Sequence, residues 1–130
     1  MSYKVVIYSK TNHENLIRDI FEEIELIVPK WVEHIHIEVT DDVECMSCNH
    51  ERAYQMLRIK VSPECLDTED VRRCFIHEVA HGFNVEIIKM CTEYIDDFVP
   101  KGKQDLFYKI FMNSVETSTE DLTLVLDRLI

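Results

Sequence analysis

The sequence predicts a single α+β domain in which a small, mainly antiparallel sheet of three strands packs with an N-terminal helix against two later helices. Segments rich in β-forming residues occur in the first half of the chain, and helical spacing of apolar residues dominates the second half. Two glycines and three prolines leave little room for linkers. A length of 130 residues suits one hydrophobic core, so we expect residues 1–130 to form one domain.

The chain begins with a predicted strand followed by a helix. Residues 3–8 form a short run of β-forming residues, which is typical of a strand. Thr11 and Glu14 have the spacing of a capping box, which predicts a helix from Thr11. Apolar residues then follow at helical spacing until Pro29: Leu16, Ile20, Ile24 and Ile27.

Two further strands are predicted where apolar and polar residues alternate, over residues 35–40 and 54–61. The polar residues 41–52 between them predict the loop of a long hairpin. His34 and His36 lie near the first of these strands, and we interpret them as solvent-facing rather than as metal ligands.

Two helices complete the prediction. Asp67 or Thr68 can cap a long helix that extends to about Phe98. Gly82 could bend or end this helix, but the helical spacing of apolar residues continues beyond it, which favours one continuous helix. The predicted core-facing stripe of this helix is Val71, Phe75, Val79, Phe83, Ile87 and Met90. After a turn at 99–102, a last helix from Lys103 or Gln104 carries Leu106, Phe107, Ile110, Phe111, Val115, Leu122, Leu126 and Leu129.

The first of these two helices contains an HExxH motif made by His77, Glu78 and His81. Residues four apart on an α-helix share a face, so both imidazoles can bind one metal ion. Glu78 is rotated away from that face, beside the position of a water molecule that the metal would acidify. The motif therefore predicts Zn²⁺ bound by the two histidines, with Glu78 as general base. The alternative is a buried helix whose histidines only satisfy neighbouring groups.

A catalytic zinc usually has three protein ligands, so a third must come from another element. The metzincin spacing fails, because Asn84 and Ile87 occupy the positions of its glycine and third histidine. In the last helix Glu116 and Glu120 lie four apart on one face, so one can bind the metal while the other supports a histidine. A solvated acidic patch is the alternative for this pair.

HExxH followed by a later helix with a glutamate, and a second acidic residue four positions on, resembles the gluzincin class of zinc metallopeptidases, in particular its minimal single-domain members. The resemblance covers about residues 54–130, and the asparagine usual before the glutamate is Val115 here. It implies a small zincin-like domain with a twisted sheet, in which a glutamate helix crosses below the active-site helix. It further implies that His77, His81 and Glu116 bind zinc, that Glu120 supports one of these ligands without binding the metal, and that Glu78 is the general base.

These features predict a zinc metalloendopeptidase that hydrolyses peptide bonds with a zinc-activated water and Glu78 as general base. An extended peptide or protein substrate could add to an exposed sheet edge, for which we expect the strand at residues 54–61. The alternative is a non-catalytic or latent protein, in which the zinc is structural or the cleft binds a peptide without cutting it. A fourth protein ligand would favour that alternative, and an open position the enzyme.

The segment Cys45–Cys48–His50 is a CxxC with a histidine two residues on, and it could supply three ligands to a second, structural zinc. A fourth ligand would have to come from Cys65, His36 or elsewhere. An ordinary loop is the favoured interpretation, since no second CxxC is present. We interpret Cys74 and Cys91 as small buried hydrophobic residues of their helix.

The overall charge narrows the possible partners. A net charge of −11 argues against binding a nucleic-acid backbone and makes basic or neutral partners easier to accept. We see no apolar run long enough to span a membrane and no secretory signal, and an odd number of cysteines, five, fits a reducing compartment. We therefore expect a cytoplasmic protein without membrane association; its oligomeric state is not predicted.

Overall fold

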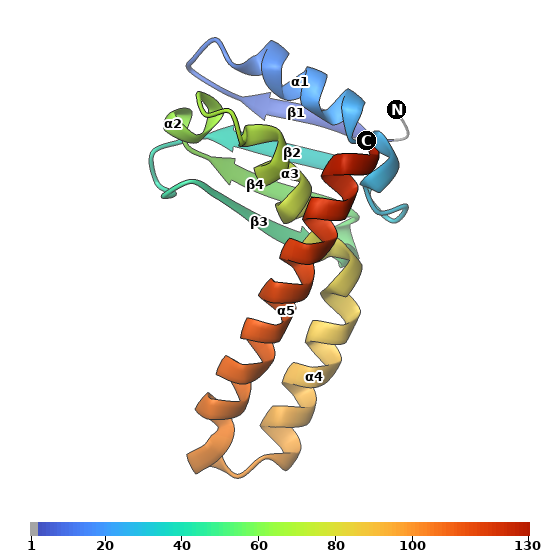
Figure 1. Cartoon of the computed structure of the whole chain (residues 1–130), viewed down its shortest axis with the longest axis vertical. Helices are drawn as coiled ribbons and strands as arrows, with labels where there is room; N and C mark the ends of the chain where they lie inside the picture. Colours follow the sequence, from blue (N-terminus) through green and yellow to red (C-terminus); the bar gives the residue numbers. More distant parts are fainter. Residues whose placement is uncertain (1–2) are drawn as a thin grey trace.

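The structure is a computed structural model that describes residues 3–130. In Figure 1, α1 and α3 lie in front of a four-stranded sheet, and a hairpin of α4 and α5 extends away from it. The strands are β1 (Lys4–Tyr8), β2 (His34–Val39), β3 (Met46–Glu51) and β4 (Met56–Val61). The α-helices are α1 (Glu14–Glu23), α2 (Pro63–Leu66), α3 (Val71–Ala80), α4 (Val85–Phe98) and α5 (Lys101–Leu129). Three short 3₁₀ helices are η1 (Glu25–Ile27), η2 (Arg52–Tyr54) and η3 (His81–Asn84).

The sheet is mixed, with the spatial order β1-β2-β4-β3. β1 runs parallel to β2 and β2 parallel to β4, whereas β3 is antiparallel to β4. The predicted three-stranded, mainly antiparallel sheet is therefore wrong. The predicted loop at 41–52 contains β3, which reverses the chain before β4, so β2 and β4 do not form a hairpin. No β-branched or aromatic residue occurs in β3 (MSCNHE), which is why propensity did not indicate a strand there.

The hydrophobic core lies between the sheet and its helices. Alternate residues of β2 and β4 are buried, as their sequence pattern predicted, and these are Ile35, Ile37, Leu57, Ile59 and Val61. On the α-helical side, the rings of Phe21 from α1 and Phe75 from α3 meet edge to face, with centroids 5.3 Å apart. His34 and His36 alternate with the buried residues of β2, and so they lie on the opposite face of the sheet.

The N-terminal helix is shorter than predicted. α1 begins at Glu14 instead of Thr11 and ends at Glu23, and the chain continues as η1 toward Pro29. The predicted capping box does not form, because the hydroxyl of Thr11 bonds Nδ1 of His13 at 2.6 Å. His13 in turn contacts Asp67 at 2.8 Å, which ties the start of the helix to the segment after α2.

The predicted continuous helix from residue 67 or 68 to about 98 is also wrong. The chain forms α3, then η3 at His81–Asn84, then α4. Gly82, within this break, is buried, and a Cβ there would lie 3.0 Å from Cγ of Pro29 and 3.1 Å from Cδ2 of His50. Beyond the break the predicted core stripe leaves the core: Phe83, Ile87 and Met90 are 52%, 52% and 64% exposed.

The last helix, α5, runs beside α4 and then crosses α3 (Figure 1). It begins at Lys101, directly after Pro100 and slightly before the predicted start. Asp127 pairs with both Arg72 and Arg73 of α3, which fixes the register of the crossing. The buried face of α5 carries Val115, Thr119 and Thr123, whereas Leu129 is exposed, contrary to the predicted apolar register.

Within residues 3–130, no helix is both long enough and apolar enough to span a membrane.

Candidate metal centre

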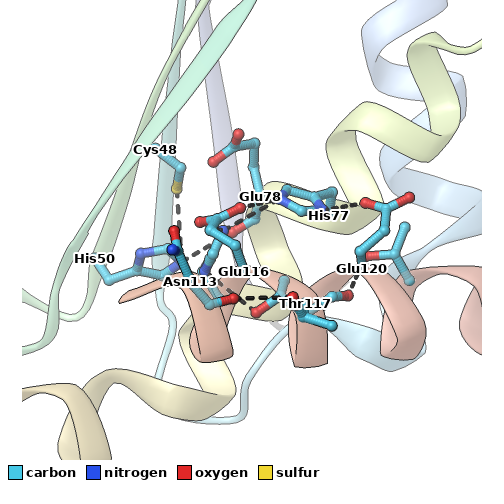
Figure 2. A network of polar contacts seen from close by, with 11 residues as sticks. Cys48, His50, His77, Glu78, Asn113, Glu116, Thr117 and Glu120 are labelled. Atoms are coloured by element: carbon cyan, nitrogen blue, oxygen red, sulfur yellow. Dashed lines mark hydrogen bonds and ion pairs between the residues drawn. The ribbon is translucent and has the colours of Figure 1, made fainter. Parts of the chain in front are cut away.

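His77 of the HExxH motif lies near Glu116 where α5 crosses α3 (Figure 2), and His81, the second histidine of the motif, belongs to the same group. Nε2 of His77 lies 3.2 Å from Nε2 of His81. One carboxylate oxygen of Glu116 lies 3.1 Å from Nε2 of His81, and the other lies 3.3 Å from Nε2 of His77. The structure thus brings together the three side chains predicted as metal ligands.

These separations fit the size of a zinc site. Donors at about 2.0–2.1 Å from a zinc ion, arranged as a tetrahedron, lie roughly 3.3 Å from one another. The two Nε2 atoms are 3.2 Å apart, and each lies 3.1 or 3.3 Å from a different oxygen of Glu116, so the nearest contacts are close to that value. Two imidazoles and a carboxylate are also a common ligand set for catalytic zinc. Among the described residues the converging group has three members, which leaves a fourth position free of protein ligands.

The far side of each imidazole faces a group on α5. Nδ1 of His77 lies 2.9 Å from a carboxylate oxygen of Glu120, one turn beyond Glu116, as the sequence predicted (Figure 2). This buried Nδ1 has no hydrogen-bond partner among the described residues, and the Glu120 oxygen lies close to it without forming such a bond. Nδ1 of His81 lies 3.5 Å from the hydroxyl of Thr119, which is fully buried. Such contacts orient metal-binding histidines, and zinc binding would hold both rings in this position.

Glu78 lies beside the three ligands without belonging to the converging group. Burial raises the pKa of its carboxyl group to about 7, an effect that His77 opposes and Glu116 reinforces. A carboxylate with a pKa near neutrality can both accept and return a proton at that pH. Glu78 therefore has the position and the acidity expected of a general base.

Two neighbouring pockets open onto this centre. One, of about 420 Å³, is lined by His77, Glu78 and Glu120 together with Cys45 and Cys74. The other, of about 360 Å³, lies between β3 and the ligands and is also lined by His77 and Glu78. The predicted base is thus accessible from both pockets, on the side where the edge strand β3 passes the helix.

The three-ligand zinc knuckle considered as an alternative for Cys45–Cys48–His50 does not form, because Cys48 lies beside His50 whereas Cys45 groups with Cys65 and Cys74. Nε2 of His50 donates a hydrogen bond to the backbone carbonyl of Glu78 at 3.1 Å, and Sγ of Cys48 lies 3.7 Å from the same nitrogen. Burial lowers the pKa of His50 to about 4, against the effect of its hydrogen bond to Glu78. His50 is therefore a neutral support of the HExxH helix.

Sequence reasoning missed two of these supporting residues. Thr119 lies three residues after Glu116, so helical spacing could have placed it on the same face, although its polar side chain suggested exposure. His50 gave no comparable signal, because its contact with Glu78 depends on β3 being the edge strand beside α3.

Comparisons of the chain with models of protein families, with curated proteins and with solved structures find no match.

Proposed function

We propose that this chain is a zinc metalloendopeptidase with a zincin-like domain, in which His77, His81 and Glu116 hold the metal and Glu78 is the general base. The observation that carries the proposal is the convergence of His77, His81 and Glu116, whose nearest donor atoms lie 3.1–3.3 Å apart, with Glu78 lining the same pocket and outside this group. A bound zinc ion would supply Lewis acidity, polarising a carbonyl group and lowering the pKa of water to about 7.

Glu78 would perform the proton transfers of the reaction. Its carboxylate accepts a proton from the attacking water as the water oxygen bonds to the carbonyl carbon of the substrate. The same carboxyl group then donates that proton to the amide nitrogen as the carbon–nitrogen bond breaks. A pKa raised to about 7 by burial suits both steps at neutral pH.

A peptide substrate would bind along β3. The strand at 54–61, for which we expected this role, has β2 on one side and β3 on the other, so its backbone groups are already paired. β3 is an edge strand and lines the smaller pocket through Ser47, Cys48 and His50. An extended segment paired with β3 would pass the free position of the metal centre, and the net charge of −11 favours basic or neutral segments.

The experiment compares the zinc-loaded parent chain with Glu78→Gln against a mixture of basic and neutral peptides. We expect the variant to retain zinc and to lose at least about 10²-fold in rate, because the substitution removes the base and keeps the ligands. Glu93→Gln is the matched control, because Glu93 is exposed on α4 and lines neither pocket of the centre. Its rate should equal that of the parent.

Two outcomes would contradict the mechanism. A Glu78→Gln variant as fast as the parent would remove Glu78 from the reaction. A parent with full zinc occupancy and no hydrolysis of any peptide would favour the latent or structural alternative, in which the centre binds zinc without catalysis.

A further inference from the structure

Three cysteines from separate segments meet beside the pocket of about 420 Å³, and two of them, Cys45 and Cys74, line it. Cys45 directly precedes β3, Cys65 lies in α2 and Cys74 lies in α3. Their Sγ atoms all lie within 4.8 Å of one another, and all three are free thiols. Cys65 is buried, Cys74 is half-buried and Cys45 is exposed. Sequence spacing had instead grouped Cys45 with Cys48, which faces His50.

The backbone holds two of these residues through Ser62. The amide of Ser62 donates to the carbonyl oxygen of Cys45 at 2.8 Å, and the hydroxyl of Ser62 accepts from the amide of Cys65 at 3.1 Å. The hydroxyl of Thr68 also donates to the carbonyl oxygen of Cys65 at 2.7 Å. These bonds hold the backbone of Cys45 and Cys65 beside each other, and helix α3 carries the third cysteine.

The spacing suits a soft metal ion. With zinc–sulfur bonds of about 2.3 Å, the sulfurs of a tetrahedral site lie roughly 3.8 Å apart. Sulfurs already within 4.8 Å would therefore move by about 1 Å or less, which side-chain rotation can supply. Thiolates select zinc and similar soft ions over magnesium or calcium. We propose that Cys45, Cys65 and Cys74 form a second metal site, for a thiophilic divalent ion such as zinc, independent of the HExxH centre.

Binding would convert three thiols into thiolates. Burial and the neighbouring Cys45 raise the pKa of Cys65 and of Cys74, so both are protonated when no metal is bound. Three S–H bonds break, three metal–sulfur bonds form and three protons pass to the solvent. Cys45 and Cys74 line the pocket of about 420 Å³, from which solvent could complete the coordination of a bound ion. Affinity for the metal should consequently rise with pH.

The site would fasten the edge strand to the HExxH helix. Cys74 lies one helical turn before His77 and Glu78, and Cys45 directly precedes the first residue of β3. An ion bound to both would fix the start of β3 against α3, beside the pocket that His77 and Glu78 also line. This arrangement needs no catalysis by Glu78, so it stands whether or not the chain is a peptidase.

The test measures metal stoichiometry and cobalt spectra of the whole chain. The parent should bind about two zinc ions, and a His77→Ala/His81→Ala variant should keep about one. Cobalt in that variant should show the near-ultraviolet charge-transfer absorption of thiolate ligands. A Cys45→Ser/Cys65→Ser/Cys74→Ser variant should lose this absorption and one zinc. Cys48→Ser and Cys91→Ser are the matched controls, because neither residue belongs to the cluster, and both should retain it.

Cys45→Ser alone covers the case in which the triple variant does not fold, because Cys45 is exposed and its loss leaves the core intact. It should weaken zinc binding at this site at least about 10-fold. The proposal is overturned if the His77→Ala/His81→Ala variant binds no zinc, or if the purified parent carries a disulfide within the cluster. It is also overturned if the cobalt–thiolate absorption is unchanged in Cys45→Ser or is lost in Cys48→Ser.

Discussion

Glu120 lies directly behind His77, with its carboxylate oxygen 2.9 Å from Nδ1, while Nε2 of the same ring faces Glu116 at 3.3 Å. One histidine is thus placed between two glutamates that are one helical turn apart on α5. In the proposed zinc site this relationship gives different roles to two residues that look equivalent in the sequence, because Glu116 at Nε2 would bind the metal and Glu120 at Nδ1 would orient the ring.

We therefore predict that Glu116→Ala weakens zinc binding more than Glu120→Ala. Loss of a group that orients a ligand typically reduces metal affinity by roughly 10- to 100-fold, and loss of a ligand should cost more. Titration of the two metal-free variants with zinc, in competition with a chelating dye, measures both affinities. The opposite ranking, or a Glu120 oxygen at about 2 Å from the metal in a zinc-bound crystal structure, would reverse the two assignments.

A second prediction concerns Thr119, whose hydroxyl lies 3.5 Å from Nδ1 of His81. Thr119→Val keeps the shape and removes the hydroxyl, so we expect zinc affinity to fall about 10-fold. Thr123→Val is the matched control, because Thr123 is equally buried but donates to the carbonyl oxygen of Thr119 at 2.7 Å, away from the imidazole. Equal zinc affinities in the two variants would show that the Thr119 hydroxyl does not orient His81.

Gly82 should not tolerate a side chain. A Cβ at this position would lie 3.0 Å from the ring of Pro29 and 3.1 Å from the ring of His50, which its hydrogen bond to Glu78 holds in place. We expect Gly82→Ala to lower the free energy of unfolding by about 1–2 kcal/mol, measured by denaturant titration. Gly102→Ala is the control, because a Cβ there would meet nothing within 4 Å among the described residues apart from its own turn of α5, and it should stabilise by about 0.5 kcal/mol. A Gly82→Ala chain as stable as the parent would mean that both rings can move aside.

The fourth prediction is a pH dependence of stability in the metal-free chain. Burial lowers the pKa of His50 to about 4 from its usual 6.5, so between these values the unfolded chain binds a proton that the folded chain does not. The contribution of His50 to the free energy of unfolding is therefore complete above pH 6.5 and decreases as the pH falls toward 4. Denaturant titrations from pH 7 to pH 4 measure this decrease.

His50→Gln supplies the comparison for this effect. Glutamine can still donate to the Glu78 carbonyl but does not titrate, so the variant should show a flatter loss of stability below pH 6.5. Identical pH profiles in the parent and the variant would show that other groups cause the acid sensitivity.

The sequence by itself determined the parts of this protein that depend on local geometry. His77 and His81 share a face because an α-helix brings residues four apart together, and the same rule aligns Glu116 with Glu120. The buried residues of β2 and β4 followed from alternation, because successive side chains of a strand point to opposite faces.

Only the tertiary structure decided how distant segments meet. β3 has little intrinsic strand propensity and exists through its pairing with β4, so the sheet order could not be predicted. The motif helix ends at Ala80, and Pro29 and His50 pack close to Gly82 just beyond it, although the apolar spacing continued past this point. Cys45 groups with Cys65 and Cys74 instead of with Cys48. Cys65 and Cys74 are 20 and 29 positions away in the chain. Spacing along the sequence could not predict this group, because the docking of α2 and α3 brings its members together.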